Sequence, residues 1–475
     1  MDKSKRKGLD KGKSMDYSKL GKEITRLDRK YGYFNTIIKP KAGSKGGKLS
    51  GIAISVKDNI CVKDVQATAG SRILEGYKPP FDATVVARAR VAGGVIIGKT
   101  SQDEFGFGTF STNSGFKVPK NPHDPTRACG GSSGGAAGLT AAWPDSDKTG
   151  IPHIALGQST GGSISCPASF CGVVGLTPTY GLVSRYGLID YANSLDKIGP
   201  IAKNVKDAAL LLSVIAGYDQ RDQTSIDLKK EDYTKYVDQP VKGLKIGVPK
   251  EYFGGSGAGA EGIDKDVEKK VWNAIKELEE LGATYHKVSL PSTKYVIAAY
   301  YIIATTEAST NLAKFCGMRY GASLPIDGSS GSFNEYFSKV RSKYLGKEAK
   351  RRILLGTYAR MAGYRDAYYL KALKARTIII NEFKSAFKNA DLLAAPTMPV
   401  IAPKFSEIKG MTPIQQYMMD ILTAAPNLAG LPMLSVPIGT SKGMPVGLHL
   451  MADHLQEGKL IQAGSAFDDH KELKA

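Results

Sequence analysis

Short apolar segments alternate with amphipathic segments along most of this 475-residue chain. Strand-like runs such as 52–56 and 245–248 are each followed by a stretch in which apolar residues recur at helical spacing. Alternation of this kind favours an α/β fold, in which helices cover a central sheet. Because no linker clearly divides the chain, we expect residues 49–475 to form one compact domain with a central mixed β-sheet surrounded by α-helices.

The same periodicity predicts where the main elements lie. Residues 1–48 are expected to form a basic N-terminal tail followed by a helix over 17–31. The expected strands cover 52–56, 95–97, 245–248, 391–395, 434–437 and 446–450. The expected helices cover 82–92, 206–216, 267–281, 295–315, 349–361 and 364–387.

Composition limits the classes of partner and the cellular compartment that we expect for this chain. The formal charge of +20 favours polyanions such as nucleic acid, although general solubility explains it equally well. No apolar run approaches the roughly 18 residues that a membrane span needs, so we expect no membrane partner. Five cysteines without a CxxC pair argue against a disulfide framework or a metal site. With no secretory signal at the N-terminus, these features favour the cytoplasm.

Two glycine-rich loops that carry serines indicate the chemistry. They are Cys129–Gly135 and Gly157–Ser163. Glycine lets a backbone approach a ligand closely, and successive backbone N–H groups can stabilise a developing oxyanion. Serine adds a hydroxyl that can act as a nucleophile once a base activates it. Together the loops indicate acyl transfer.

Two other interpretations of the glycine-rich segments are weaker. Residues 93–100 match the phosphate-loop pattern GxxxxGK[ST], but their central residues are those of a buried strand and not of an open loop. Ser132, Ser133 and Ser159 each lie in a G-x-S-x-G string, the nucleophile elbow of α/β hydrolases. That elbow needs a preceding strand and a later histidine, for which His449 and His454 are the candidates. A proline-broken loop precedes Ser132 instead.

A lysine can supply the base. The apolar run 52–56 leads directly into Lys57, and burial lowers the pKa of a lysine towards neutrality. In this arrangement Ser132 relays a proton to Lys57 while Ser163 attacks the substrate. The oxyanion would be held by the N–H groups just before the nucleophile, those of Thr160, Gly161 and Gly162.

Four segments resemble the amidase signature family. They are Gly51–Asn59, Gly98–Phe105, Gly130–Gly135 and Thr160–Ile164. That family uses a Ser–cis-Ser–Lys triad, and the resemblance implies Lys57 as base, Ser132 as bridging serine and Ser163 as nucleophile. One departure concerns Ser159 and Ser165, which stand where the family usually has an acidic residue and an arginine. We expect these two side chains to meet and to support the nucleophile loop, Gly157–Ser163.

Further segments resemble one branch of the family, the A subunits of glutamyl-tRNA(Gln) amidotransferases. They are Cys171–Gly187, Asn193–Pro200, Lys350–Thr357 and Asn427–Pro432. The resemblance implies hydrolysis of glutamine and transfer of the ammonia to a B subunit, which amidates misacylated tRNA with ATP and Mg²⁺; a C subunit completes the complex. It implies no cofactor and no metal in this chain. It also implies that Arg352 and Asp420 hold the carboxylate and the ammonium of free glutamine.

Other interpretations stay open at this level. The chain could be a stand-alone amidase of the same family that acts on small amides. It could also be a catalytically inactive tRNA-binding scaffold, as the charge of +20 suggests. Arg352 and Asp420 could simply lie on solvated helix faces, a serious alternative for Arg352 because basic residues surround it.

Overall fold

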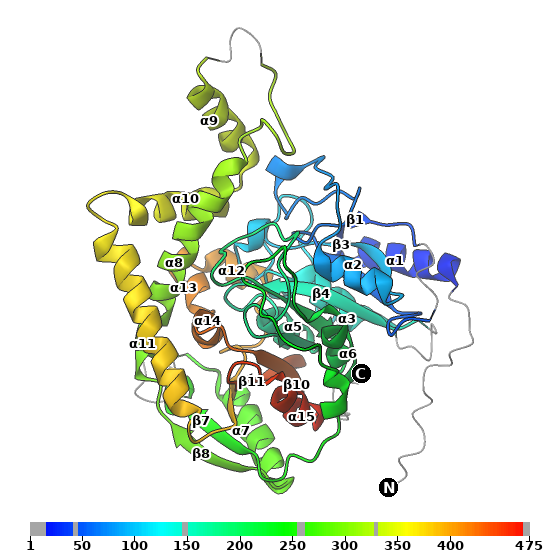
Figure 1. Cartoon of the computed structure of the whole chain (residues 1–475), viewed down its shortest axis with the longest axis vertical. Helices are drawn as coiled ribbons and strands as arrows, with labels where there is room; N and C mark the ends of the chain where they lie inside the picture. Colours follow the sequence, from blue (N-terminus) through cyan, green and yellow to red (C-terminus); the bar gives the residue numbers. More distant parts are fainter. Residues whose placement is uncertain (1–15, 41–45, 145–150, 254–261, 327–330, 469–475) are drawn as a thin grey trace.

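One mixed sheet runs through the molecule (Figure 1). The computed structural model describes residues 16–40, 46–144, 151–253, 262–326 and 331–468. Within them the strand order is β1-β3-β2-β4-β6-β5-β10-β11-β9-β7-β8. The strands are β1 Phe34–Ile37, β2 Ala53–Lys57, β3 Val95–Thr100, β4 His153–Ser159, β5 Val174–Thr177, β6 Lys197–Ala202, β7 Lys245–Pro249, β8 Thr284–Val288, β9 Leu392–Pro396, β10 Met433–Ser441 and β11 Met444–Ala452.

Helices surround the sheet. The helix α8 packs against both α10 and α11, and these three stand along one flank of the molecule (Figure 1). The helices are α1 Tyr17–Tyr31, α2 Thr84–Val91, α3 Gly134–Ala142, α5 Ser165–Cys171, α6 Val205–Ile215, α7 Lys265–Glu280, α8 Val296–Asn311, α9 Phe333–Tyr344, α10 Lys347–Arg360, α11 Lys371–Ala386, α12 Phe405–Gly410, α13 Pro413–Met418, α14 Ile421–Leu428 and α15 Glu457–Ser465. The predicted α/β fold with a central mixed sheet is confirmed.

The middle of the sheet positions the site. The strand β2 lies between β3 and β4 and is parallel to both. Its residues are buried on both faces, as expected for a parallel strand that is covered on each side. The strand β6 then pairs antiparallel with β4, which brings Lys197 opposite Ser159. The C-terminal ends of β2 and β4 and the N-terminal end of β6 therefore lie next to one another.

The N-terminal helix forms as the periodicity predicts. The helix α1 begins after Asp16, whose carboxylate accepts a hydrogen bond from Lys19 N at 3.0 Å, and it ends at Gly32, whose φ is +75°. The following strand β1 pairs antiparallel with β3 at one edge of the sheet. The expected basic tail over residues 1–15 lies outside the described residues, and the domain boundary at residue 48 stays a prediction.

Two further features concern membrane spans and cysteines. In the part of the chain that the structure describes, no helix has the length and apolar character needed to cross a membrane. The five cysteines are free thiols, and all but Cys316 are buried.

Candidate active site

Lys57 is the last residue of β2, and its side chain is fully buried. Its Nζ donates hydrogen bonds to Ser132 Oγ at 2.7 Å, to Gln158 O at 2.8 Å and to Gln158 Oε1 at 3.1 Å. Burial lowers the pKa of Lys57 to about 7, against the opposing pull of the Asp103 and Asp196 carboxylates. A substantial fraction of this amine is therefore neutral near physiological pH.

Ser132 belongs to a loop whose glycines are required for close packing. The peptide bond between Gly131 and Ser132 is cis. A Cβ on Gly131 would lie 2.3 Å from Asp103 Oδ2, so a larger residue does not fit there. Asp103 accepts hydrogen bonds from Ser111 N and Asn113 N, both at 2.9 Å, and Ser111 Oγ in turn donates to Gly130 O at 2.9 Å. These bonds hold the Ser132 loop against the segment that follows β3, while Lys57 joins the loop to β2.

The second loop connects β4 to α5 and contains Ser163, whose side chain is 7% exposed. Ser163 O accepts a hydrogen bond from Ser133 N at 3.2 Å, which joins the two serine loops. A Cβ on Gly161 would lie 2.5 Å from Tyr300 OH, and one on Gly162 would lie 2.3 Å from Thr423 Oγ1. A side chain at either position would force Tyr300 or Thr423 to shift. The structure brings the two predicted loops together beside Lys57.

A carboxylate that sequence reasoning missed organises the nucleophile loop. Asp196 Oδ1 accepts hydrogen bonds from Thr160 Oγ1 at 2.6 Å and from Gln158 Nε2 at 3.0 Å. Its Oδ2 accepts from Tyr191 N at 2.8 Å and from Ala192 N at 3.1 Å. Burial raises the pKa of Asp196 to about 7, and the Thr160 hydroxyl and Tyr191 amide oppose that shift. Gln158 links Asp196 to Lys57, so Lys57 and the Ser163 loop share one network.

Replacing Asp196 with alanine should lower the free energy of unfolding by about 3 kcal/mol, because it leaves several buried donors unpaired. Urea denaturation measures this loss. The matched control is Asp190→Ala, since Asp190 forms a partly exposed ion pair with Lys314 at 2.9 Å, worth at most about 1 kcal/mol. Equal losses in the two variants would contradict the assigned role of Asp196.

Arg352 is buried, with 2% of its surface exposed. Its Nε donates to Glu348 Oε1 at 2.8 Å, and another guanidinium N–H donates to Tyr191 OH at 2.7 Å. Four rings surround the guanidinium at 5.1 to 5.7 Å, those of Phe107, Tyr191, Tyr301 and Tyr417. The interpretation of Arg352 as part of a solvated helix face is wrong.

Asp420 lies close to Arg352, because Tyr301 contacts both. Tyr301 OH donates to Asp420 Oδ2 at 2.6 Å while its ring faces the Arg352 guanidinium at 5.1 Å, and Thr109 Oγ1 donates to Asp420 Oδ1 at 3.2 Å. Burial raises the pKa of Asp420, and the Tyr301 hydroxyl and Arg352 oppose the shift. The structure therefore brings one cation and one anion together within a buried aromatic cluster. Asp420, like Arg352, is not on a solvated face.

Tyr191 connects this charged pair to the nucleophile loop. Its hydroxyl accepts from Arg352, and its backbone N–H donates to Asp196, which holds Thr160. Tyr300, whose hydroxyl lies against Gly161, makes an edge-to-face contact with Tyr301 at 4.9 Å between ring centroids. The two predicted residue sets therefore belong to one continuous site.

Ser159 and Ser165 are both buried, and neither hydroxyl has a hydrogen-bond partner among the described residues. They are therefore not joined to each other by a hydrogen bond, and the expected support of the nucleophile loop by these side chains is not seen.

The structure also argues against the phosphate-loop and nucleophile-elbow interpretations. The strand β3 occupies most of the phosphate-loop pattern, and Lys99 Nζ is buried 3.0 Å from Asp58 O, so this lysine is not available to a phosphate. His449 is buried with neither ring nitrogen bonded within the described residues, and burial and nearby Lys197 lower its pKa to about 3. His454 contacts Asp453 and Ala429 O instead of a serine.

The chain is similar to amidases over most of its length. The Amidase family model matches residues 36–461. The glutamyl-tRNA(Gln) amidotransferase A subunit of Methanococcoides burtonii is 52% identical over 433 residues, which are 90% of this chain and 87% of that protein. The crystal structure of the Thermotoga maritima protein of the same name is 38% identical with a TM-score of 0.79, and the match covers 95% of this chain and 90% of that one. The native peptide amidase from Stenotrophomonas maltophilia is 29% identical with a TM-score of 0.76, over 96% and 94%.

Proposed function

Because this chain belongs to the amidase signature family, as its motifs predict, we propose that it is the glutamine-hydrolysing component of a tRNA-dependent amidotransferase, its A subunit. The observation that carries the proposal is the buried Lys57 amine 2.7 Å from Ser132 Oγ, beside the loop that contains Ser163. The protein would convert glutamine to glutamate and ammonia. It would deliver that ammonia for amidation of Glu-tRNA(Gln), and of Asp-tRNA(Asn) if the partner accepts it.

The proposed reaction is acyl transfer in two steps. Neutral Lys57 takes a proton through Ser132 as Ser163 Oγ attacks the side-chain amide carbon of glutamine. The negative charge on the amide oxygen is stabilised by the backbone N–H groups of Thr160, Gly161 and Gly162. The proton returns to the leaving nitrogen and ammonia departs, leaving a glutamyl ester on Ser163. Water then attacks the ester carbon, and Lys57 and Ser132 return the proton to Ser163.

Arg352 and Asp420 are proposed to hold the two ends of the amino acid. The Arg352 guanidinium would bind the α-carboxylate, and the Asp420 carboxylate would bind the α-ammonium. Their burial supports this role, since a charged pair away from water recognises a zwitterion more strongly than an exposed pair does. An amide that lacks an α-carboxylate and an α-ammonium would leave Arg352 and Asp420 without ionic partners in the substrate.

The relatives are named as A subunits of an amidotransferase, which supports a complex with further subunits. The complex would contain B and C subunits, and it would bind misacylated tRNA. ATP and Mg²⁺ would be used by the partner, with no cofactor or metal in this chain, and the complex would work in the cytoplasm.

A glutaminase assay of the reconstituted complex, with and without misacylated tRNA, tests the proposal. Absence of glutamine hydrolysis under both conditions would overturn it.

The similarity to a peptide amidase keeps a second function in view, a stand-alone amidase that acts on small amides. Co-purification from the native cell separates the two. A chain that copurifies with no partner and hydrolyses small amides faster than glutamine would be the stand-alone enzyme.

Replacing Arg352 with alanine should raise the KM for glutamine by about 10- to 100-fold, since a buried charged hydrogen bond contributes roughly 1.5 to 3 kcal/mol. Steady-state kinetics with glutamine measures the effect. The control is Arg351→Ala, because Arg351 is the neighbouring arginine, 43% exposed and also paired with Glu348. An unchanged KM in Arg352→Ala would remove Arg352 from the substrate site.

A further inference from the structure

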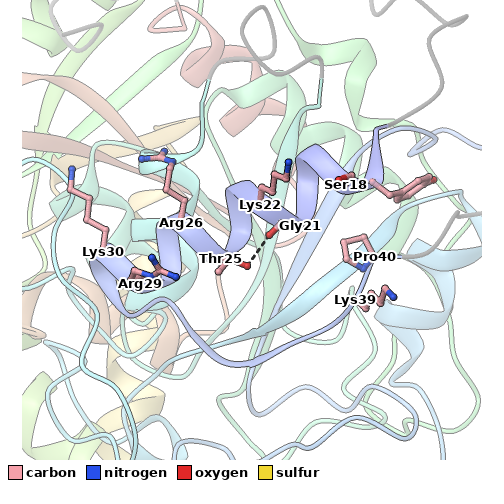
Figure 2. Close-up of a pocket in the computed structure, with 10 residues that line it drawn as sticks. Ser18, Gly21, Lys22, Thr25, Arg26, Arg29, Lys30, Lys39 and Pro40 are labelled. Carbon is pink, nitrogen blue, oxygen red and sulfur yellow. Dashed lines mark hydrogen bonds between the residues drawn. The ribbon is translucent and has the colours of Figure 1, made fainter.

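A basic hollow lies along the outer side of α1 (Figure 2), the helix at the β1 edge of the sheet (Figure 1). Leu20, Ile24 and Leu27 on the inner side of the helix are buried in the core. The hollow has a volume of about 930 Å³. It is lined by Tyr17, Ser18, Gly21, Lys22, Thr25, Arg26, Arg29, Lys30, Lys39 and Pro40, which include five basic residues and no acidic residue.

The charges of this hollow are largely available to a ligand. Its five basic side chains are exposed. Arg26 pairs with Glu23 at 2.6 Å, but an exposed ion pair contributes little and can be exchanged for another. Within the described residues, no acidic side chain pairs with Lys22, Arg29 or Lys39. Figure 2 shows the basic side chains of α1 spread along the helix, with Lys39 beside its N-terminal end.

We propose that the basic hollow binds the sugar–phosphate backbone of RNA. Lys22 and Arg29 lie seven residues apart, about 10 Å along the helix axis, so they can contact separate phosphates of one strand. The exposed hydroxyl of Ser18 can donate to a phosphate or ribose oxygen, whereas the hydroxyl of Thr25 donates to Gly21 O at 2.9 Å (Figure 2). The net charge of +20 favours the same ligand class. Only the identity of the RNA, a tRNA, rests on the proposed function.

An anionic membrane fits this surface less well than RNA does. A basic amphipathic helix binds a membrane by burying its apolar side among the lipids. In α1 that side is already occupied, because Leu20, Ile24 and Leu27 pack in the protein core. Apart from Tyr17 and Pro40, the exposed side offers charged and hydroxyl side chains, which suit a hydrated phosphate backbone.

The test compares two double variants of the full-length chain. Lys22→Gln with Arg29→Gln removes two charges from the hollow. Lys269→Gln with Lys276→Gln is the control, since these lysines are exposed on α7 with the same seven-residue spacing. Binding of a tRNA transcript is measured by filter retention between 50 and about 200 mM KCl. We expect the hollow variant to bind about tenfold more weakly, with the slope of log K against log salt reduced by about 2. The control should bind like the unaltered chain.

Three results would overturn the inference. One is equal affinity and equal slope in the two double variants. Another is absence of tRNA binding by the unaltered chain at 50 mM KCl, a salt concentration at which about six phosphate contacts give strong binding. A third is binding to phosphatidylserine vesicles that the hollow variant loses while tRNA binding persists. Glutamine hydrolysis by the reconstituted complex, assembled with the same variants, reports on the proposed function separately, because Lys22 and Arg29 are not part of the triad.

Discussion

Replacing Ser163 with alanine should reduce glutamine hydrolysis at least about a thousandfold, because the attacking oxygen is removed. The same variant, assembled with its partners, should still amidate misacylated tRNA when ammonium chloride replaces glutamine. The physical reason is that the serine is needed only to release ammonia, and the Ser163 main chain still joins the two loops through its carbonyl. Glutamate release and amidated tRNA are measured in parallel.

Ser165→Ala is the matched control for this variant. Ser165 lies two residues further along and is buried, but its hydroxyl has no hydrogen-bond partner among the described residues. Removing it should change glutamine hydrolysis by no more than about twofold, since no bond is lost. Full glutamine hydrolysis by Ser163→Ala would place the nucleophile elsewhere. Loss of the ammonium-dependent reaction as well would show that the substitution acts on folding or assembly.

The fold class follows from the sequence, but the sheet does not follow in detail. Long segments with clear periodicity, such as those of α1 and α7, were predicted close to their observed bounds. Strands β1, β4, β5, β6 and β8 were missed. Two of these, β1 and β5, have only four residues, and β6 contains Gly199 and Pro200. The strand order was beyond prediction, since β10 and β11 insert between β5 and β9 through contacts that are distant in sequence.

The site divides in the same way. Lys57 is recognisable because it ends an apolar run, and the serines are recognisable because glycines surround them. Asp196 and Gln158 were missed as site residues, because their pairing depends on how β4 lies against β6. One signal was present in the sequence: both are polar residues within or next to segments that are otherwise apolar.

Arg352 shows where helical spacing contained more information than composition. Its neighbours Lys350 and Arg351 suggest a solvated basic surface. Glu348 lies four residues before Arg352, however, and such a pair shares one side of a helix with Ala349 and Gly356. In α10 all four are buried. The apolar and small residues at helical spacing predict that this side of the helix faces inward, and the charged pair goes with it.

Replacing Lys57 with methionine should lower kcat/KM for glutamine by about 10²- to 10⁴-fold, because the general base is lost while a side chain of similar length stays in the core. In the unaltered protein only neutral Lys57 accepts a proton, so activity should rise with pH. With the pKa of Lys57 near 7, log kcat/KM should climb with a slope of about 1 below that value and level off above it. Burial also raises the pKa of Asp196 to about 7, and the Asp196 carboxylate raises the pKa of Lys57, so the midpoint depends on both groups.

A second buried lysine provides the control for this prediction. Burial also lowers the pKa of Lys197 to about 7, but its Nζ donates to Leu431 O at 2.8 Å and not to a serine of the triad. Lys197→Met should therefore leave the midpoint of the pH profile in place, even where stability falls. If Lys197→Met lost the acidic limb of the pH profile and Lys57→Met kept it, the base would be Lys197 on β6 and not Lys57 on β2. Both amines are buried and titrate alike, so their pKa values do not distinguish them. Geometry distinguishes them, because only Lys57 lies within hydrogen-bond distance of Ser132.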